Sequence, residues 1–175
     1  MNVIIIGKIK DTFVQELKSR VIETFDSLIS DWGIIAKLKP AKSAYDSERN
    51  QYNASDLLKF AKNEMKNHER KKFLILTDVD LYSSELNFVF GQADCPGSFA
   101  IVSLHRLNPI FYDQNNDEEL FLLRATKEVV HEIGHTFGLG HCTDPKCVMS
   151  FSNSILAVDQ KKKLLCGDCR EKLGI

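Results

Sequence analysis

One short stretch of the sequence holds histidines and a glutamate at a spacing that suits a metal ion. His131-Glu132-Ile133-Gly134-His135 is an HExxH pattern, and Gly138 and His141 extend it to HExxHxxGxxH. On a helix, residues four apart lie about 40° apart around the axis and about 6 Å apart along it, so both imidazoles can reach one ion. Glu132, next to the first ligand, can contact a water on the metal without binding the metal itself.

The third histidine constrains the path of the chain after this helix. His141 lies ten residues after His131, which on a continuous helix is about 15 Å further along the axis. We therefore expect the chain to turn back at Gly138, because glycine tolerates positive φ. Three neutral imidazoles and a water form an open zinc site of the catalytic type. A site that binds zinc without catalysis, as in a degenerate protease, is the alternative.

Four cysteines near the C-terminus form a second candidate metal site. Cys142, Cys147, Cys166 and Cys169 lie within 28 residues, and the last two form a CxxC turn. Four thiolates close the coordination shell, which predicts a structural zinc that stabilises a segment with few large apolar residues. Free thiols and a redox-active CxxC are the alternatives. Cys95 is expected to be an ordinary loop thiol, with an inhibitory zinc ligand as its alternative.

Composition sets the broad class of the protein. The 175 residues are 43% hydrophobic and 27% charged, with a net charge of −1. This balance excludes global disorder and gives no reason to expect a nucleic-acid or membrane partner. No apolar run reaches the length of a signal sequence or a membrane span. We therefore expect one cytoplasmic domain, 1–175, that is monomeric and keeps its thiols reduced.

Hydrophobic periodicity predicts the elements that position these sites. Helices are expected over 12–29 (capped by Asp11 or Thr12), 54–66 (capped by Ser55) and 117–137, and a Lys-rich helix from about Asp159. Strands are expected over 1–8, 33–38, 73–77, 86–90 and 98–104, with a loop over 39–53. Alternating strands and helices predict an α/β fold with a parallel sheet and right-handed crossovers.

The metal motifs resemble those of a known family. HExxHxxGxxH is similar to the motif of the metzincin zinc metalloproteases. The run from His131 to Cys169 resembles the archaemetzincins in its order of features: a cysteine directly after the third histidine, a second cysteine, Met149, and then CxxC. Between Met149 and CxxC there are 16 residues, close to the spacing in that family. A weaker resemblance to the archaemetzincins is seen in Gly91-Gln92-Ala93 and Arg106-Leu107.

The resemblance implies both a fold and a site. The fold would be a metzincin-like mixed sheet with two packing helices, an active-site helix and a small zinc-stabilised C-terminal subdomain. The chain would divide into an N-terminal subdomain, residues 1–138, which contains the active-site helix, and a C-terminal subdomain, residues 139–175. His131, His135 and His141 would bind a catalytic zinc, and Cys142, Cys147, Cys166 and Cys169 a structural zinc, so that each chain holds two zinc ions. Met149 would form the Met-turn under the imidazoles. Phe151 stands where some metzincins have a tyrosine ligand and has no donor atom.

These observations predict a zinc metallopeptidase in which Glu132 activates a zinc-bound water for attack on a peptide bond. The resemblance to metzincins further implies that the peptide would add as an antiparallel strand to the segment 87–94. An ordinary strand and turn is the alternative for this segment. The alternative is a catalytically silent zinc-binding interaction module on the same fold; a nucleic-acid-binding zinc ribbon is disfavoured by the charge.

Five further features are expected to have ordinary roles. His68 and His105 are expected not to bind metal, and Arg106 to pair locally. The lysines at 71–72 and 161–163 are expected to be solvated.

Overall fold

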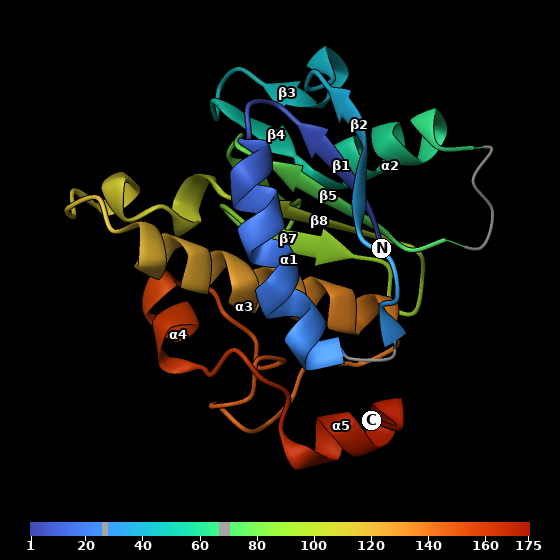
Figure 1. Ribbon diagram of the computed structural model, residues 1–175. Coiled ribbons are helices and arrows are strands. Elements are labelled where there is room, and N and C mark those ends of the chain that lie inside the picture. The colour runs from blue at the N-terminus through green and yellow to red at the C-terminus, as the bar shows by residue number, and fades with distance from the viewer. Residues whose placement is uncertain (26–27, 67–70) are drawn as a thin grey trace.

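A five-stranded mixed sheet forms the centre of the molecule. The computed structural model describes residues 1–25, 28–66 and 71–175, and its main sheet has the strand order β2-β1-β5-β8-β7 (Figure 1). Four strands are parallel, and β7 runs antiparallel to β8 at the edge. The predicted α/β class is therefore confirmed. The strands are β1 (Asn2–Ile6), β2 (Gly33–Leu38), β5 (Phe73–Thr77), β7 (Gly91–Ala93) and β8 (Phe99–Ser103).

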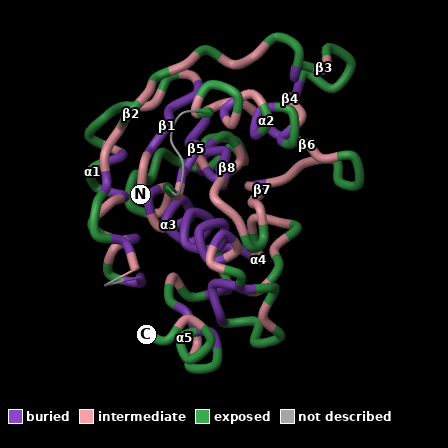
Figure 2. The backbone as a smooth tube through the Cα atoms, turned by 90° about the vertical axis from the view of Figure 1, so that its right-hand side faces the viewer, coloured by how far each residue is buried: buried purple, intermediate pink, exposed green. Residues whose placement is uncertain are grey.

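Three helices cover the two faces of this sheet. Alternate residues of a strand point to opposite faces, and each face has its own core. Val3 and Ile5 pack in the core that includes α1 (Asp11–Phe25) and α3 (Glu118–Thr136). Ile4 and Ile6 pack in the core that includes α2 (Ala54–Glu64). The central strands and most of α3 are buried (Figure 2), so the candidate metal motif lies on an interior helix.

Side chains define where two of these helices begin. Asp117 Oδ1 accepts a hydrogen bond from Leu120 N at 2.9 Å and caps α3. Asn53 Oδ1 accepts from Asp56 N at 3.2 Å and caps α2, so the expectation that Ser55 is the cap is wrong. The helix expected over 12–29 is seen from Asp11 to Phe25, while its residues 26–27 lie outside the described part of the chain.

Two sequence predictions are wrong in the middle of the chain. The expected loop over 39–53 contains a 3-10 turn (Lys42–Ala44) and the strands β3 (Tyr45–Asp46) and β4 (Gln51–Asn53). Together with β6 (Leu81–Tyr82) these form a second sheet, β3-β4-β6. The expected strand over 86–90 is irregular. Its two aromatic residues pack against each other, since Phe88 and Phe90 meet edge to face at 5.2 Å, while Leu86 is exposed.

The C-terminal segment also differs from the expectation. Its helices are α4 (Ile155–Gln160) and α5 (Gly167–Leu173), and no helix starts at Asp159. Ser154 caps α4, accepting a hydrogen bond from Ala157 N at 3.3 Å. After α4 the chain is extended at Lys161, whose side chain enters the interior. Figure 1 shows α4 against α3 and α5 near the C-terminus. Among the described helices, none has the length and apolarity needed to cross a membrane.

Candidate metal centre

Three histidines that are separate in sequence meet beside α3. The candidate ligand nitrogens of His131, His135 and His141 all lie within 4.8 Å of one another. His131 and His135 share one face of α3, and their Nε2 atoms are 3.0 Å apart. Nitrogens about 2.1 Å from a tetrahedral zinc lie about 3.4 Å apart. The donor set and its spacing therefore fit one zinc ion.

Backbone carbonyls orient two of the imidazole rings. His131 Nδ1 lies 2.9 Å from Val148 O, and His135 Nδ1 lies 2.7 Å from Leu139 O. Since a carbonyl can only accept, each Nδ1 carries the proton and each Nε2 presents a lone pair. Two lone pairs facing each other at 3.0 Å repel unless a cation lies between them. This arrangement is the strongest structural indication of a metal site here.

Desolvation favours the neutral form of these imidazoles, more for buried His131 than for exposed His141. It lowers the pKa of all three histidines, and most strongly that of His131, which is only 5% exposed. Neutral imidazole is the form that binds a metal.

A tight turn after α3 returns the third histidine to the site. The helix ends at Thr136, and Gly138 has φ +94°. Gly138 N donates to His135 O at 2.8 Å, and Leu139 N donates to Gly134 O at 3.1 Å. The turn brings His141 back to the other two histidines. The centroid of its ring lies 5.4 Å from that of His131 and 5.0 Å from that of His135.

Met149 lies under the histidine helix and is fully buried. A Cβ built on Gly134 would lie 2.5 Å from its sulfur, so the glycine between the two helical histidines admits the thioether. Cys142 N donates to Met149 O at 2.9 Å, which joins this segment to the residue after His141.

Glu132 faces the edge of the sheet. It is 5% exposed, and burial, followed by the neighbouring Glu128 carboxylate, raises its pKa well above the usual value, while Lys161 opposes that rise. A Cβ on Gly91 in β7 would lie 2.6 Å from Glu132 Cγ and 2.7 Å from Oε1. The glycine therefore lets the edge strand approach this carboxylate.

Two charged residues close to Glu132 were missed by sequence reasoning. Lys161 Nζ lies 2.8 Å from Glu128 Oε1, at an angle outside hydrogen-bond geometry. The expectation that 161–163 is solvated is wrong for Lys161, which is 2% exposed. Glu128 precedes Glu132 by four residues, and this helical spacing could have revealed it. No local pattern distinguishes Lys161 from its neighbouring lysines.

The expectation of a solvated lysine pair is also wrong for Lys72. Its ammonium donates to Thr136 O and Gly97 O, both at 2.5 Å. Lys72 thus binds the C-terminal end of the helix that carries the histidines.

The four C-terminal cysteines form a second cluster whose sulfurs all lie within 4.8 Å. The Cys142–Cys166 and Cys147–Cys169 sulfur pairs are 3.7 and 3.8 Å apart, and none of these residues is in a disulfide. Sulfurs about 2.3 Å from a tetrahedral zinc lie about 3.8 Å apart. The spacing fits a closed four-thiolate zinc site.

Of the other candidates that the structure describes, Arg106 and His105 contact residues outside the histidine cluster, whereas Cys95 and Phe151 lie beside it. Arg106 pairs with both oxygens of Asp80 at 2.7 Å. His105 contacts Phe111, and His68 lies outside the described residues. Cys95 is exposed, and its thiol lies 3.4 Å from Leu139 O. Phe151 is 49% exposed, with its ring centroid 5.1 Å from that of His141.

Comparison with known proteins shows close relatives. Residues 1–174 match the profile of peptidase family M54. The archaemetzincin of Methanopyrus kandleri is 44% identical over 160 residues, covering 89% of this chain and 87% of the relative. That of Methanocaldococcus jannaschii is 39% identical over 168 residues, covering 96% of this chain and 89% of the relative.

Solved structures agree with these sequence matches. The crystal structure of the Methanopyrus kandleri archaemetzincin superposes with a TM-score of 0.79 at 38% identity, covering 99% of this chain and 93% of that one. A zinc-dependent peptidase from Methanocorpusculum labreanum superposes with a TM-score of 0.86 at 30% identity, covering 98% of each chain.

Proposed function

The chain belongs to peptidase family M54, the archaemetzincins, and is a zinc metallopeptidase; we propose that Glu132 is its general base and that His131, His135 and His141 hold the catalytic zinc. The observation that carries this proposal is the convergence of three imidazole nitrogens within 4.8 Å, with a buried carboxylate at the position that follows His131 on the same helix. We further propose that Cys142, Cys147, Cys166 and Cys169 hold a second, structural zinc, and that the chain is a cytoplasmic monomer.

Different residues bind the metal and transfer the proton. Zinc, when bound, supplies a Lewis acid that polarises the scissile carbonyl and makes water a stronger acid. Glu132 accepts the proton of the attacking water and returns it to the leaving amine. Burial and the nearby Glu128 carboxylate raise its pKa, and a higher pKa makes a carboxylate a stronger base for the proton of the water. Met149 and Gly134 support the histidines from below through close packing.

The peptide is proposed to bind along β7. In the described part of the chain this strand pairs with β8 alone, so its outer edge can accept an extended peptide as a further antiparallel strand. Gly91 brings that edge against Glu132. Phe151, half-exposed beside His141, would contact a side chain of the bound peptide and favour an apolar one. The segment proposed for peptide binding from the sequence, 87–94, thus narrows to the strand Gly91–Ala93.

A peptide library tests this proposal. Zinc-loaded protein should cleave a subset of peptides, and Glu132→Ala should lower the rate by about 10²–10⁴-fold while zinc stays bound. Loss of the histidine-site zinc in Glu132→Ala would instead make Glu132 a ligand. Equal cleavage rates for the unmodified protein and Glu132→Ala would show that Glu132 does not take part in the reaction. Absence of any cleavage by fully loaded protein would favour the catalytically silent module.

A further inference from the structure

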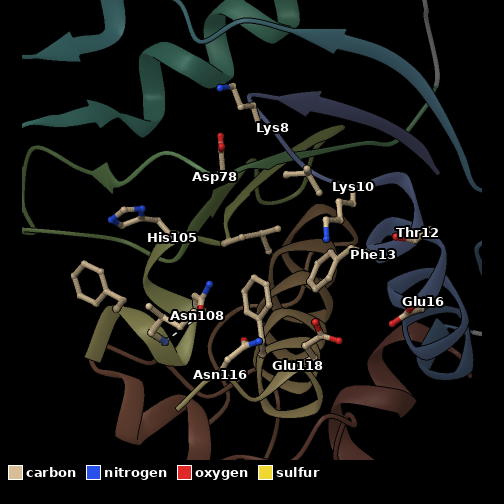
Figure 3. A pocket seen from close by; sticks show the side chains of 15 residues that line it. Lys8, Lys10, Thr12, Phe13, Glu16, Asp78, His105, Asn108, Asn116 and Glu118 are labelled. Atoms are coloured by element: carbon tan, nitrogen blue, oxygen red, sulfur yellow. Dashed lines mark hydrogen bonds between the residues drawn. The ribbon is translucent and has the colours of Figure 1, made fainter. Parts of the chain in front are cut away.

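A cavity lies at the start of α3, the opposite end of this helix from the histidines. Its volume is about 580 Å³, within the range of roughly 300–1,000 Å³ typical of small-molecule sites. Glu118 and Phe121, which line it, belong to the first turn of α3, and Figure 3 shows Glu118 in this position. His131 lies about 20 Å further along the helix axis. The cavity is therefore separate from the proposed active site.

The fold puts this cavity where parallel sheets commonly bind ligands. β1 and β5 are neighbours, yet the chain leaving β1 continues to β2 on one side, and the chain leaving β5 continues towards β8 on the other. Such diverging connections open a crevice at the carboxyl ends of the strands. Lys8 and Lys10 follow β1, and Asp78 follows β5, and all three line the cavity.

The wall carries charges of both signs. Lys8 and Lys10 are cationic, whereas Glu16, Asp78 and Glu118 are anionic. Within residues 1–25, 28–66 and 71–175, the charged ends of Lys10, Asp78 and Glu118 make no hydrogen bond or ion pair. Asp78 is half-buried and lies over Gly7, where a Cβ would be 1.8 Å from its Oδ1. Figure 3 shows Lys10 and Glu118 on opposite sides of the Phe13 ring.

Aromatic and aliphatic side chains lie between these charges. The rings of Phe13 and Phe121 pack with centroids 4.9 Å apart, and Leu104 and Ile110 line the same cavity. An apolar surface bordered by both charges fits a molecule that carries an ammonium, a carboxylate and an apolar body. A phosphate or other simple anion fits less well, because three carboxylates face the cavity.

We propose that this cavity binds an amino acid or a short peptide with free amino and carboxyl ends. Lys10 pairs with the carboxylate of the ligand, Glu118 faces its ammonium, and the Phe13–Phe121 pair contacts its side chain. Peptide hydrolysis releases molecules of this class, but the binding itself does not require the proposed activity.

Free phenylalanine is a suitable probe, because a peptidase cannot cleave it. Amide chemical shifts of the zinc-loaded protein are followed by NMR during titration with phenylalanine, N-acetylphenylalanine, phenylalaninamide and inorganic phosphate. We expect saturable shifts at residues 8–13, 104–108 and 116–121 with phenylalanine. Each blocked derivative should bind at least about tenfold more weakly, because it lacks one charged end.

Variants locate the site. Lys10→Met and Glu118→Gln should each weaken phenylalanine binding by about tenfold or more. The matched changes Lys59→Met and Glu64→Gln, at exposed positions of α2, should leave it unchanged. The proposal is overturned if no saturable shift occurs at these residues, if shifts are confined to 131–149, or if a blocked derivative or phosphate binds as well as phenylalanine. None of these outcomes depends on hydrolysis, so failure here is distinct from failure of the proposed function.

Discussion

Lys161 and Glu128 form an ion pair in the interior, 2.8 Å apart, with side chains only 1% and 4% exposed. Glu128 lies one turn of α3 before Glu132, and Lys161 follows α4. Lys161 therefore links the C-terminal segment to the face of α3 that carries the proposed general base.

Replacing Lys161 should destabilise the protein strongly. Lys161→Met leaves the Glu128 carboxylate buried without a partner, which should cost about 3–5 kcal/mol of unfolding free energy in urea denaturation. Lys163→Met is the matched control, because its pair with Glu23 is 33% and 56% exposed and should contribute about 0–1 kcal/mol. The double variant Lys161→Met/Glu128→Leu should recover most of the loss. Equal costs for the two lysines would contradict a structural role for the buried pair.

A methyl group at Gly91 should interfere with Glu132. In Gly91→Ala the new Cβ would lie 2.6 Å from Glu132 Cγ and 2.7 Å from Ile101 O, so either the edge strand or the carboxylate must shift. We expect a stability loss of about 1–3 kcal/mol and a larger fractional loss of peptide hydrolysis. Gly140→Ala has open space around the new atom and should change neither. Full activity in Gly91→Ala would show that Glu132 tolerates displacement.

Zinc should leave the protein in two phases. A fully loaded chain should contain two zinc ions, and mild chelation should remove the ion of the three histidines first, because three imidazoles and an open position hold zinc less firmly than four thiolates. Elemental analysis during chelation measures this. One zinc per replete chain, or a single phase, would contradict the assignment of two sites.

Loss of the cysteine site should weaken the histidine site. In Cys169→Ser we expect α5 and the 142–147 segment to loosen, because Cys142 is bonded to His141 and donates to Met149 O. The zinc affinity of the histidine site and peptide hydrolysis should both fall. α4 should stay in place, because Arg124 pairs with Asp159 at 2.6 Å and Lys127 Nζ donates to Val158 O at 2.9 Å. Hydrogen exchange and zinc titration test this, and unchanged zinc affinity without the second ion would refute the coupling.

For protein that lacks the histidine-site zinc, the free energy of unfolding should decrease as the pH is lowered below about 6.5. Burial lowers the pKa of the three histidines in the folded chain, whereas in the unfolded chain it is about 6.5. The unfolded state therefore binds more protons as pH falls, and the unfolding free energy decreases by up to about 1.4 kcal/mol per pH unit for a buried histidine such as His131. His141 is exposed and contributes less.

Glu132 acts in the opposite direction, because its raised pKa makes the folded chain take up a proton first as pH falls. The measurement is therefore urea unfolding of Glu132→Gln protein between pH 7 and 5. Adding His131→Phe should flatten the dependence on pH, and identical slopes would contradict the role assigned to His131.

The sequence by itself determined the features that rest on local spacing. The HExxHxxGxxH motif and the two cysteine pairs predicted which side chains would meet, because ligand spacing on a helix and in tight turns is set by local geometry. The strands β1, β2, β5 and β8 and the helix α3 followed from hydrophobic runs and helical periodicity that agree with burial in the fold.

Three features depend on contacts between segments that are distant in sequence, and only the tertiary structure reveals them. In the apolar run 86–90, Phe88 and Phe90 pack against each other while Leu86 stays exposed, and the edge strand that pairs with β8 is Gly91–Ala93. Lys161 is buried only because Glu128, far away in the sequence, faces it in the interior. The cavity at the start of α3 exists because the order of strands sends the connections after β1 and β5 in opposite directions. No local pattern carries this information, since each of these features arises from pairing across long stretches of chain.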